Sequence, residues 1–455
     1  MSDATWSIES AVPGIAWPPV PSPGAAQALA MLRALDATQW LPAQELALLQ
    51  LRQLDALLRH AWATVPYYEA AWSGMYEPAA ALDPAALARL PVLSRRALQD
   101  NFDRLKSSRV PREHGAPEER RTSGSTGAPV RLLATPLSGL MWNALTLRDH
   151  AWHARDLTRS LAVIRRESED ADARNWGPAT AGVVATGPAL GRSIFHDAAS
   201  HLDWLLERRP AYLFTYPSLV AELARLSIAR GVRPEGLREV RTLGETVTDG
   251  LRGLVRDAWR VPLTDLYSAN EAGYLALQCP ASGRYHVQSE NVLLEVLDDA
   301  GRTCAPGEVG RVVVTPLHNF AMPLVRYEIG DYAEVGAPCA CGRGLPVLER
   351  IVGRVRNMLT TADGRRYWPV FGARALMETA PVRQFQFVQT SSDRIVARLV
   401  CDARLSPSQE AAFRARVLSM LPAGLSLDFA YVADIPRAAS GKFEEFVSEV
   451  SGAPR

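Results

Sequence analysis

The chain has 455 residues, of which 47% are hydrophobic and 22% are charged, the usual profile of a folded globular protein with room for two or three domains. Its 50 Lys and Arg residues nearly balance its 49 Asp and Glu residues, so the charge gives no reason to expect a nucleic acid or an anionic membrane as partner. No run of about 18 apolar residues predicts a membrane-spanning helix, and the N-terminus lacks the layout of a signal peptide. Five cysteines, an odd number, do not suggest a disulfide framework in a chain this long. We therefore expect a cytoplasmic protein with reduced thiols.

The first third of the chain predicts an irregular segment followed by helices. Residues 1–40 read as an irregular lead-in, because residues 11–26 are rich in proline. Leucines spaced by three and four residues then predict an amphipathic helix over residues 42–60. Helical patterns return near residues 84–105 and 138–157.

From residue 160 onward, short apolar strands alternate with helices. Strands are predicted at residues 160–166 and 211–218, and a helix capped by Ser218 follows. The stretches "LREVRTLGE" and "LTDLYSANE" repeat the pattern of a strand that ends in polar residues. This alternation predicts an α/β fold with a largely parallel sheet, in which the loops beyond the strand ends form the site.

The pattern changes near residue 284. Strands then follow one another closely, which predicts a small β subdomain over about residues 284–352. After Gly353 the chain begins a small α+β unit with alternating strands and a capped amphipathic helix. We therefore expect a lead-in (residues 1–40), a large α/β domain (residues 41–352) and a C-terminal α+β domain (residues 353–455).

The first motif is "RRTSGSTGAPV", which places four hydroxyls and two glycines within six residues, 122–127. Backbone N–H groups freed by glycine, with Ser and Thr hydroxyls beside them, can wrap phosphate oxygens. The Gly-Lys-Ser/Thr ending of the common triphosphate loop is missing. Taken alone, the motif is equally compatible with a solvated surface loop.

The second motif, "YSANEAG", follows an apolar strand. Tyr267 could stack on a purine, and Glu271 could bind a divalent cation that bridges phosphates. The alternative is an exposed loop glutamate, which is the commoner fate of a single Glu.

Two further motifs carry single charged residues. In "MPLVRYEIGD", Gly330 permits a turn that aims Asp331 outward, where a carboxylate suits two ribose hydroxyls; the alternative is a surface ion pair with Arg326. In "SGKFEEF", Lys442 could neutralise negative charge on a phosphate-bearing transition state. The alternative is a plain solvated lysine.

Three cysteines and one histidine form a candidate metal site. Cys279 and His286 precede the pair Cys339 and Cys341, and together they make a closed tetrahedral set suited to structural zinc. The spacings are not those of a zinc finger. Buried cysteines and a surface histidine remain the alternative.

The order of these motifs resembles the adenylate-forming superfamily. "TSGSTGAP", "YSANE", "GEVGRVVVTPLHNFAMPLVRYEIGD", "CACGRGLPVLERIVGR" and a terminal "GK" occur in that order, and the chain is most similar to the phenylacetate–CoA ligase-like branch with its CapK-type members. The resemblance extends over about residues 40–445. It implies activation of a carboxylic acid by ATP as an acyl-adenylate, release of pyrophosphate, and transfer of the acyl group to an acceptor. It also implies that the C-terminal domain is mobile and rotates between the two steps.

The resemblance implies a role for each matching residue. The catalytic residues would be Lys442, which bridges the acyl carboxylate and the α-phosphate, Glu271, which holds Mg²⁺, and Thr126. ATP and AMP would be bound by Thr122, Ser123, Gly124, Ser125, Thr126, Gly127, Gly244, Glu245, Tyr267, Ser268, Asp331 and Arg354. Arg356 would be the hinge.

The acyl pocket and the acceptor follow less directly. The resemblance places Phe195, His196, Tyr212, Tyr216 and Pro217 around the acyl group, a set that suits an aryl or small organic acid. His150 and His153 could also face the pocket, but we expect them on an exposed helix.

Relatives mostly use CoA as the acceptor. Here Arg356 stands where relatives usually have an acid or a lysine, and "TTADGRRYWP" replaces the usual loop that follows, which leaves the use of CoA open. The alternatives are a ligase with an amine or hydroxyl acceptor and a catalytically silent nucleotide-binding protein; a homodimer is expected in either case.

Overall fold

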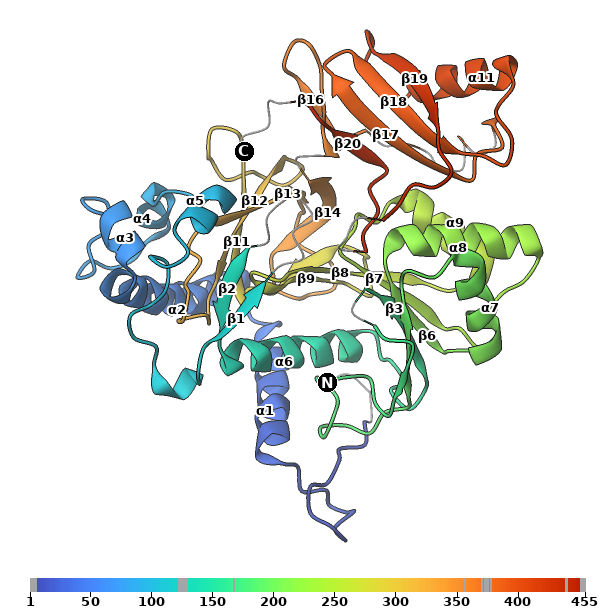
Figure 1. The fold of residues 1–455 in the computed structure, drawn as a ribbon. Coiled ribbons are helices and arrows are strands. Elements are labelled where there is room, and N and C mark those ends of the chain that lie inside the picture. Colours follow the sequence, from blue (N-terminus) through green and yellow to red (C-terminus); the bar gives the residue numbers. More distant parts are fainter. Residues whose placement is uncertain are drawn as a thin grey trace.

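The computed structural model describes residues 6–121, 130–166, 168–354, 357–369, 371, 376, 379–437 and 441–450 (Figure 1). Its helices are α1 (Pro23–Thr38), α2 (Ala43–Thr64), α3 (Pro66–Ala71), α4 (Pro84–Arg89), α5 (Arg95–Asp100), the short 3₁₀ helix Arg112–His114, α6 (Pro136–Trp152), α7 (Ala198–Arg208), α8 (Pro217–Arg230), α9 (Asp249–Trp259) and α11 (Pro407–Leu418).

One large mixed sheet dominates the fold. Its strands are β3 (Leu161–Arg165), β4 (Asp172–Ala173), β5 (Ala189–Ser193), β6 (Tyr212–Thr215), β7 (Glu239–Leu243), β8 (Leu263–Ala269), β9 (Gly273–Gln278), β10 (Tyr285–Val287), β11 (Val292–Leu297), β12 (Val309–Pro316), β13 (Tyr327–Val335) and β14 (Val347–Arg354). Among the described residues they form twelve strands in the order β11-β12-β13-β14-β10-β9-β8-β7-β6-β3-β5-β4. The stretch from β8 to β5 is parallel, while β9 to β14 pair antiparallel.

Helices cover both faces of the parallel half. Along β7, Val240 packs with the helices α8 and α9, whereas its neighbour Arg241 pairs with Asp149 of α6. Because side chains alternate between the two faces of a strand, α6 lies on one face and the α8–α9 pair on the other (Figure 1). The predicted α/β class is therefore confirmed.

The C-terminal part has a sheet and a core of its own. Strands β17 (Gln384–Ser391), β18 (Arg394–Val400), β19 (Ser426–Tyr431) and β20 (Phe446–Ser448) form a four-stranded sheet in the order β19-β18-β17-β20. Their inward residues pack with α11, which begins with a capping box at Ser406. Two small pairs complete the strands: β1 (Glu118–Arg121) with β2 (Arg131–Ala134), and β15 (Leu359–Thr360) with β16 (Arg366–Tyr367).

Three expectations about these elements are wrong. The lead-in is not irregular throughout, because Pro23–Thr38 forms α1, whose start is capped by the Ser22 hydroxyl. The strands of residues 284–352 do not form a separate sheet; they continue the large one through the β9–β10 pairing. The cap of α8 is Tyr216 rather than Ser218, because Pro217 occupies the first helical position.

The carboxyl group of one residue, Asp265, is buried within the large sheet. Asp265 on β8 accepts hydrogen bonds from the Thr242 hydroxyl at 2.7 Å and from the Tyr285 hydroxyl at 2.8 Å. Burial raises the pKa of Asp265 to about 6, although both hydrogen bonds act in the opposite direction. The folded protein therefore holds this proton more tightly than the unfolded chain does.

This raised pKa predicts a specific pH dependence of stability. The stabilising contribution of protonated Asp265 is complete below the unfolded pKa near 3.8 and is lost as the pH rises through about 6. Between pH 5 and pH 8 the wild type should lose this contribution, whereas Asp265→Asn has no such proton to lose. The unfolding free energy of the variant minus that of the wild type should therefore be about 1 kcal/mol higher at pH 8 than at pH 5. Urea unfolding at both pH values measures the difference. A constant difference between variant and wild type would contradict the assignment.

Candidate active site

Three strands of the large sheet bring three predicted site residues together. The Tyr267 hydroxyl on β8 donates to Asp331 Oδ2 at 3.0 Å, and Arg354 Nε donates to Asp331 Oδ1 at 3.1 Å. Asp331 on β13 and Arg354 on β14 are register partners in the sheet. The aspartate is therefore held from two sides. Its neighbour Gly330 has a φ of +82°, which favours glycine.

Glu271 belongs to the same site. It lies in the turn between β8 and β9, and its Oε1 is 3.7 Å from Arg95 Nη1 of α5. Burial raises the pKa of Glu271, while the positive charges of Arg95 and Arg354 lower it. Arg95 is a residue that the sequence analysis missed, since nothing in the local pattern of α5 points to a partner so far along the chain.

Lys442 also reaches this site, from the segment between β19 and β20 of the C-terminal sheet. Gly244, directly after β7, has a φ of +78°, and a Cβ atom built on it would lie 2.8 Å from Lys442 Cε and 3.0 Å from Lys442 Nζ. The lysine side chain thus lies on the glycine backbone, where any other residue would collide with it. Burial and the charge of Arg354 lower the pKa of Lys442, whereas Asp331 acts in the opposite direction.

The sequence-predicted phosphate loop, Thr122–Gly127, and the predicted hinge Arg356 lie outside the described residues. The other residues predicted to bind nucleotide are close to the site. Ser268 is half-buried next to Tyr267 on β8, and Glu245 follows Gly244.

Of the residues predicted to line the acyl pocket, Phe195 and His196 lie on the surface and Tyr212 lies away from the site. Phe195 is 63% exposed, and His196 Nε2 contacts Asp170 Oδ2 at 2.5 Å on the surface. Tyr212 begins β6 and its hydroxyl accepts from the Asp156 backbone N–H, so it lies at the opposite end of the strand from the site. Proximity in the sequence to the strand end was not enough to place these side chains.

Tyr216 and Pro217, also predicted to line the acyl pocket, lie on the same side of the sheet as Gly244 and Lys442. Both follow β6 and are buried at the start of α8. The Tyr216 ring is 3.4 Å from a Cβ atom built on Gly441, next to Lys442. The sequence analysis missed an aromatic pair formed by Trp142 of α6 and Tyr274 of β9, whose ring centroids are 4.6 Å apart.

Known proteins that are similar to this chain agree with the resemblance predicted from the sequence. Residues 359–449 match the family model of the CapK C-terminal domain. Over 340 residues the chain is 29% identical to the phenylacetate-coenzyme A ligase of Thermus thermophilus, covering 70% of this chain and 72% of that enzyme. These matches support the predicted resemblance to the adenylate-forming superfamily and its phenylacetate–CoA ligase-like branch.

Solved structures of acyl-CoA ligases share the fold. A 2-hydroxyisobutyryl-CoA ligase in the postadenylation state superposes with a TM-score of 0.71 at 18% identity, over 90% of this chain and 91% of that chain. The same ligase in its thioesterification state, with CoA bound, gives a TM-score of 0.59 at 20% identity, over 90% and 91% of the two chains. The arrangement of this chain as a whole is therefore closer to the first state.

The four predicted metal ligands converge. The ligand atoms of Cys279, His286, Cys339 and Cys341 all lie within 4.8 Å of one another. Cys341 Sγ is 3.2 Å from His286 Nε2, and His286 Nδ1 faces the Leu345 carbonyl oxygen at 3.3 Å. That carbonyl can hold the imidazole in the tautomer that leaves Nε2 free for a metal.

The chemistry of the cluster also fits a metal. Burial raises the pKa of the Cys279 thiol, but hydrogen bonds with His286 and Ser282 outweigh it and bring the pKa to about 5. A thiolate is the form that binds zinc. The cluster lies beside β9, β10 and β14 rather than at the carboxyl ends of the parallel strands.

A cluster of buried charges lies under the sheet. Arg155 pairs with Asp149 at 2.7 Å and with Glu239 at 2.7 Å, and Arg241 pairs with Asp149 at 2.6 Å. The expectation of an exposed helix near His150 is wrong, since α6 packs on the sheet along this side and His150 is 2% exposed. His153 is likewise mostly covered, 3.7 Å from Asp149.

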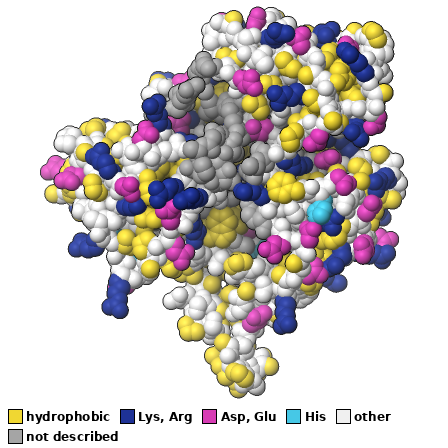
Figure 2. Space-filling view, viewed as in Figure 1, with side chains coloured by type: hydrophobic (Ala, Val, Ile, Leu, Met, Phe, Trp, Pro, Cys, Tyr) yellow, Lys and Arg dark blue, Asp and Glu magenta, His cyan; other side chains and the backbone are white. Residues whose placement is uncertain are grey.

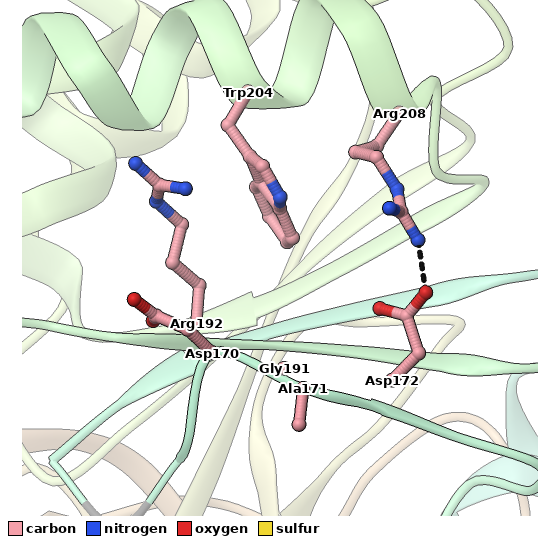
Figure 3. A pocket seen from close by; sticks show the side chains of 7 residues that line it. All are labelled: Asp170, Ala171, Asp172, Gly191, Arg192, Trp204 and Arg208. Atoms are coloured by element: carbon pink, nitrogen blue, oxygen red, sulfur yellow. Dashed lines mark hydrogen bonds and ion pairs between the residues drawn. The ribbon is translucent and has the colours of Figure 1, made fainter.

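A cavity is present on the described surface, away from the candidate active site. A cavity of about 340 Å³ lies between α7 and the edge strands β4 and β5, and Figure 3 shows Trp204 and Arg208 reaching from α7 toward it. Two of the charges at this cavity, Arg208 and Asp172, form an ion pair. Strands β6 and β3 separate it from β7, so it is not part of the candidate active site.

The outer surface has no single electrostatic character. On the face in Figure 2, basic and acidic side chains are interspersed, in line with the net charge of +1. In the described part of the chain, no helix has both the length and the apolarity needed to cross a membrane.

Proposed function

We propose that the protein is an ATP-dependent ligase that converts a carboxylic acid into its acyl-adenylate and then transfers the acyl group to an acceptor. One observation carries the proposal: Tyr267, Glu271, Asp331, Arg354 and Lys442 come from four separate segments and meet in one place. A structural role alone does not require a lysine to be buried beside an arginine. A bound phosphate would supply the missing negative charge.

Each residue has a part in the proposed first step. Asp331 would accept hydrogen bonds from the ribose hydroxyls, and Tyr267 would lie against adenine while it holds Asp331. Glu271 would hold Mg²⁺, which would neutralise charge on the phosphates. The acid oxygen would attack the α-phosphorus, the bond to pyrophosphate would break, and Lys442 would stabilise the charge shared by the carboxylate and the α-phosphate.

The loop Thr122–Gly127, with Thr126 as a catalytic hydroxyl, would hold the outgoing phosphates. Ser268 and Glu245 would lie beside the nucleotide, and the C-terminal domain would rotate about Arg356 after the first step. We place the domain boundary near residue 353, and we propose a homodimer in the cytoplasm.

The acid and the acceptor are proposed by class. Tyr216, Pro217 and the Trp142–Tyr274 pair suggest an aryl or small organic acid. CoA is the first choice of acceptor, because the relatives are named as CoA ligases. An amine or hydroxyl acceptor is the second, because the loop after Arg356 departs from the usual form. Mass spectrometry of products formed with CoA and with pooled amines separates the two.

Exchange of labelled pyrophosphate into ATP tests the proposal. With a panel of aryl and small aliphatic acids, we expect exchange that depends on the acid and on Mg²⁺. ATP binding without exchange across the whole panel, in protein shown to be folded, would instead identify a silent nucleotide-binding protein.

We also propose that the Cys279–His286–Cys339–Cys341 cluster holds one structural zinc ion. Four protein ligands leave no open position for a substrate, so the metal would stabilise the antiparallel half of the sheet and would not take part in the reaction.

A further inference from the structure

The segment that carries Lys442 is attached to the large sheet on both sides of the lysine. On one side, Gly441 has a φ of +77°, and a Cβ atom built on it would lie 3.1 Å from Arg166 Cβ and 3.3 Å from Ile194 Cγ2. On the other side, the Phe443 backbone N–H donates to Glu245 Oε1 at 2.7 Å. The backbone on either side of Lys442 is thus in direct contact with the large domain.

Glu245 is itself held by the start of α8. Its Oε2 accepts from the Ser218 backbone N–H at 2.8 Å, and the Ser218 hydroxyl donates to Oε1 at 3.1 Å. A carboxylate at this position also interacts favourably with the N-terminus of a 14-residue helix. Both oxygens of Glu245 therefore have protein donors, which leaves little capacity to bind the nucleotide.

A second link joins the same group to the C-terminal part. Arg437 Nη1 donates to the Ser218 hydroxyl at 2.6 Å, and Arg437 Nη2 is 3.6 Å from Glu222 Oε2 on α8. Arg437, Ser218, Glu245 and the Phe443 N–H form one continuous chain of hydrogen bonds. The chain begins and ends on the C-terminal segment and passes through the large domain.

We propose that Glu245 is a positioning residue, which fixes Lys442 over Gly244 by binding the Phe443 N–H from its anchor on α8. This inference rests on the proposed function, since it assigns Glu245 to the lysine rather than to the nucleotide. The bonds join the two domains, so they exist only in this domain arrangement, which resembles the postadenylation state of the related ligase more than its thioesterification state. Glu245 therefore serves adenylation and not the second step.

Glu245→Gln is the test variant. Each carboxylate oxygen accepts from a different backbone N–H, so the amide NH₂ of glutamine must face one of these donors and cannot bond to it. Glu235→Gln is the matched control, because Glu235 is a surface residue with 72% of its side chain exposed. Ser218→Ala is a milder second variant that removes only the hydroxyl link.

The first measurement needs no substrate. The chain contains two lysines, Lys106 and Lys442, so reductive methylation followed by peptide mass spectrometry compares a buried amine with an internal reference. We expect Glu245→Gln to raise the labelling rate of Lys442 relative to Lys106 by about tenfold, Ser218→Ala to raise it less, and Glu235→Gln to leave it unchanged. An unchanged ratio in folded Glu245→Gln protein would overturn the inference.

The second measurement uses pyrophosphate exchange. Glu245→Gln should lower kcat by about ten- to a hundredfold, with the KM for ATP nearly unchanged and with acyl transfer from a supplied acyl-adenylate preserved. A large rise in KM at constant kcat would show that Glu245 binds nucleotide, and would overturn the inference. If the wild type shows no exchange while the labelling ratio still rises, the positioning role holds and the proposed function fails.

Discussion

We expect Lys442→Ala to lower the rate of acyl-adenylate formation by about 10²–10³-fold while ATP still binds. In the proposed reaction the lysine stabilises charge that develops only as the acid attacks, so its loss should affect the transition state far more than the bound nucleotide. Asp331, Arg354 and Tyr267 keep their mutual hydrogen bonds without it. Acid-dependent pyrophosphate exchange and equilibrium binding of ATP measure the two quantities separately.

Two further variants make this result specific. Lys106→Ala removes the chain's other lysine, which pairs with Asp103, and should leave exchange unchanged. Lys442→Arg keeps the charge but replaces the compact ammonium with a longer, planar guanidinium that cannot occupy the same position. It should be nearly as slow as the alanine variant. Full activity in Lys442→Ala would show that the lysine has no part in the reaction.

Replacement of Cys339 by serine should remove the metal from the protein. Purified wild-type protein should contain about one zinc per chain, and Cys339→Ser clearly less, because the closed site loses one of its four ligands. The thermal midpoint should fall as well, since binding of a structural metal contributes directly to folding free energy. Elemental analysis and thermal unfolding give the two numbers.

Cys401→Ser is the control for this experiment. Cys401 is a free, partly buried cysteine outside the cluster, and its replacement should change neither zinc content nor the effect of a chelator. Undiminished zinc in Cys339→Ser would exclude this set of ligands. Zinc loss should leave pyrophosphate exchange measurable at low temperature, because no residue of the cluster touches Tyr267, Asp331 or Lys442 in the described structure.

Local patterns predicted the parts of the fold that local physics determines. Apolar runs that end in polar residues marked β3, β7 and β8, and the carboxyl ends of parallel strands explain why Gly244 and Tyr267 lie close together. Periodic leucines marked α2, and Ser406 correctly predicted the start of α11. These signals act over a few residues.

Positions that depend on distant contacts could not be predicted in the same way. Tyr212 begins β6 and Tyr216 directly follows it, so an error of a few residues in the predicted strand bounds was enough to assign Tyr212 to the wrong end. His150 belongs to α6, whose weakly amphipathic sequence gives no sign that the helix is packed on several sides. The proline-rich start similarly hid α1, whose contacts are made with α6.

The position of Lys442 in the chain has a consequence for synthesis. The large sheet is complete once β14 has been made, whereas Lys442 follows only after most of a further domain. Domains fold as units while the chain emerges from the ribosome. A growing chain would therefore pass through a stage that can already hold ribose at Asp331 but lacks the amine that the reaction needs. Chemistry would begin only when the last strand of the second sheet is in place.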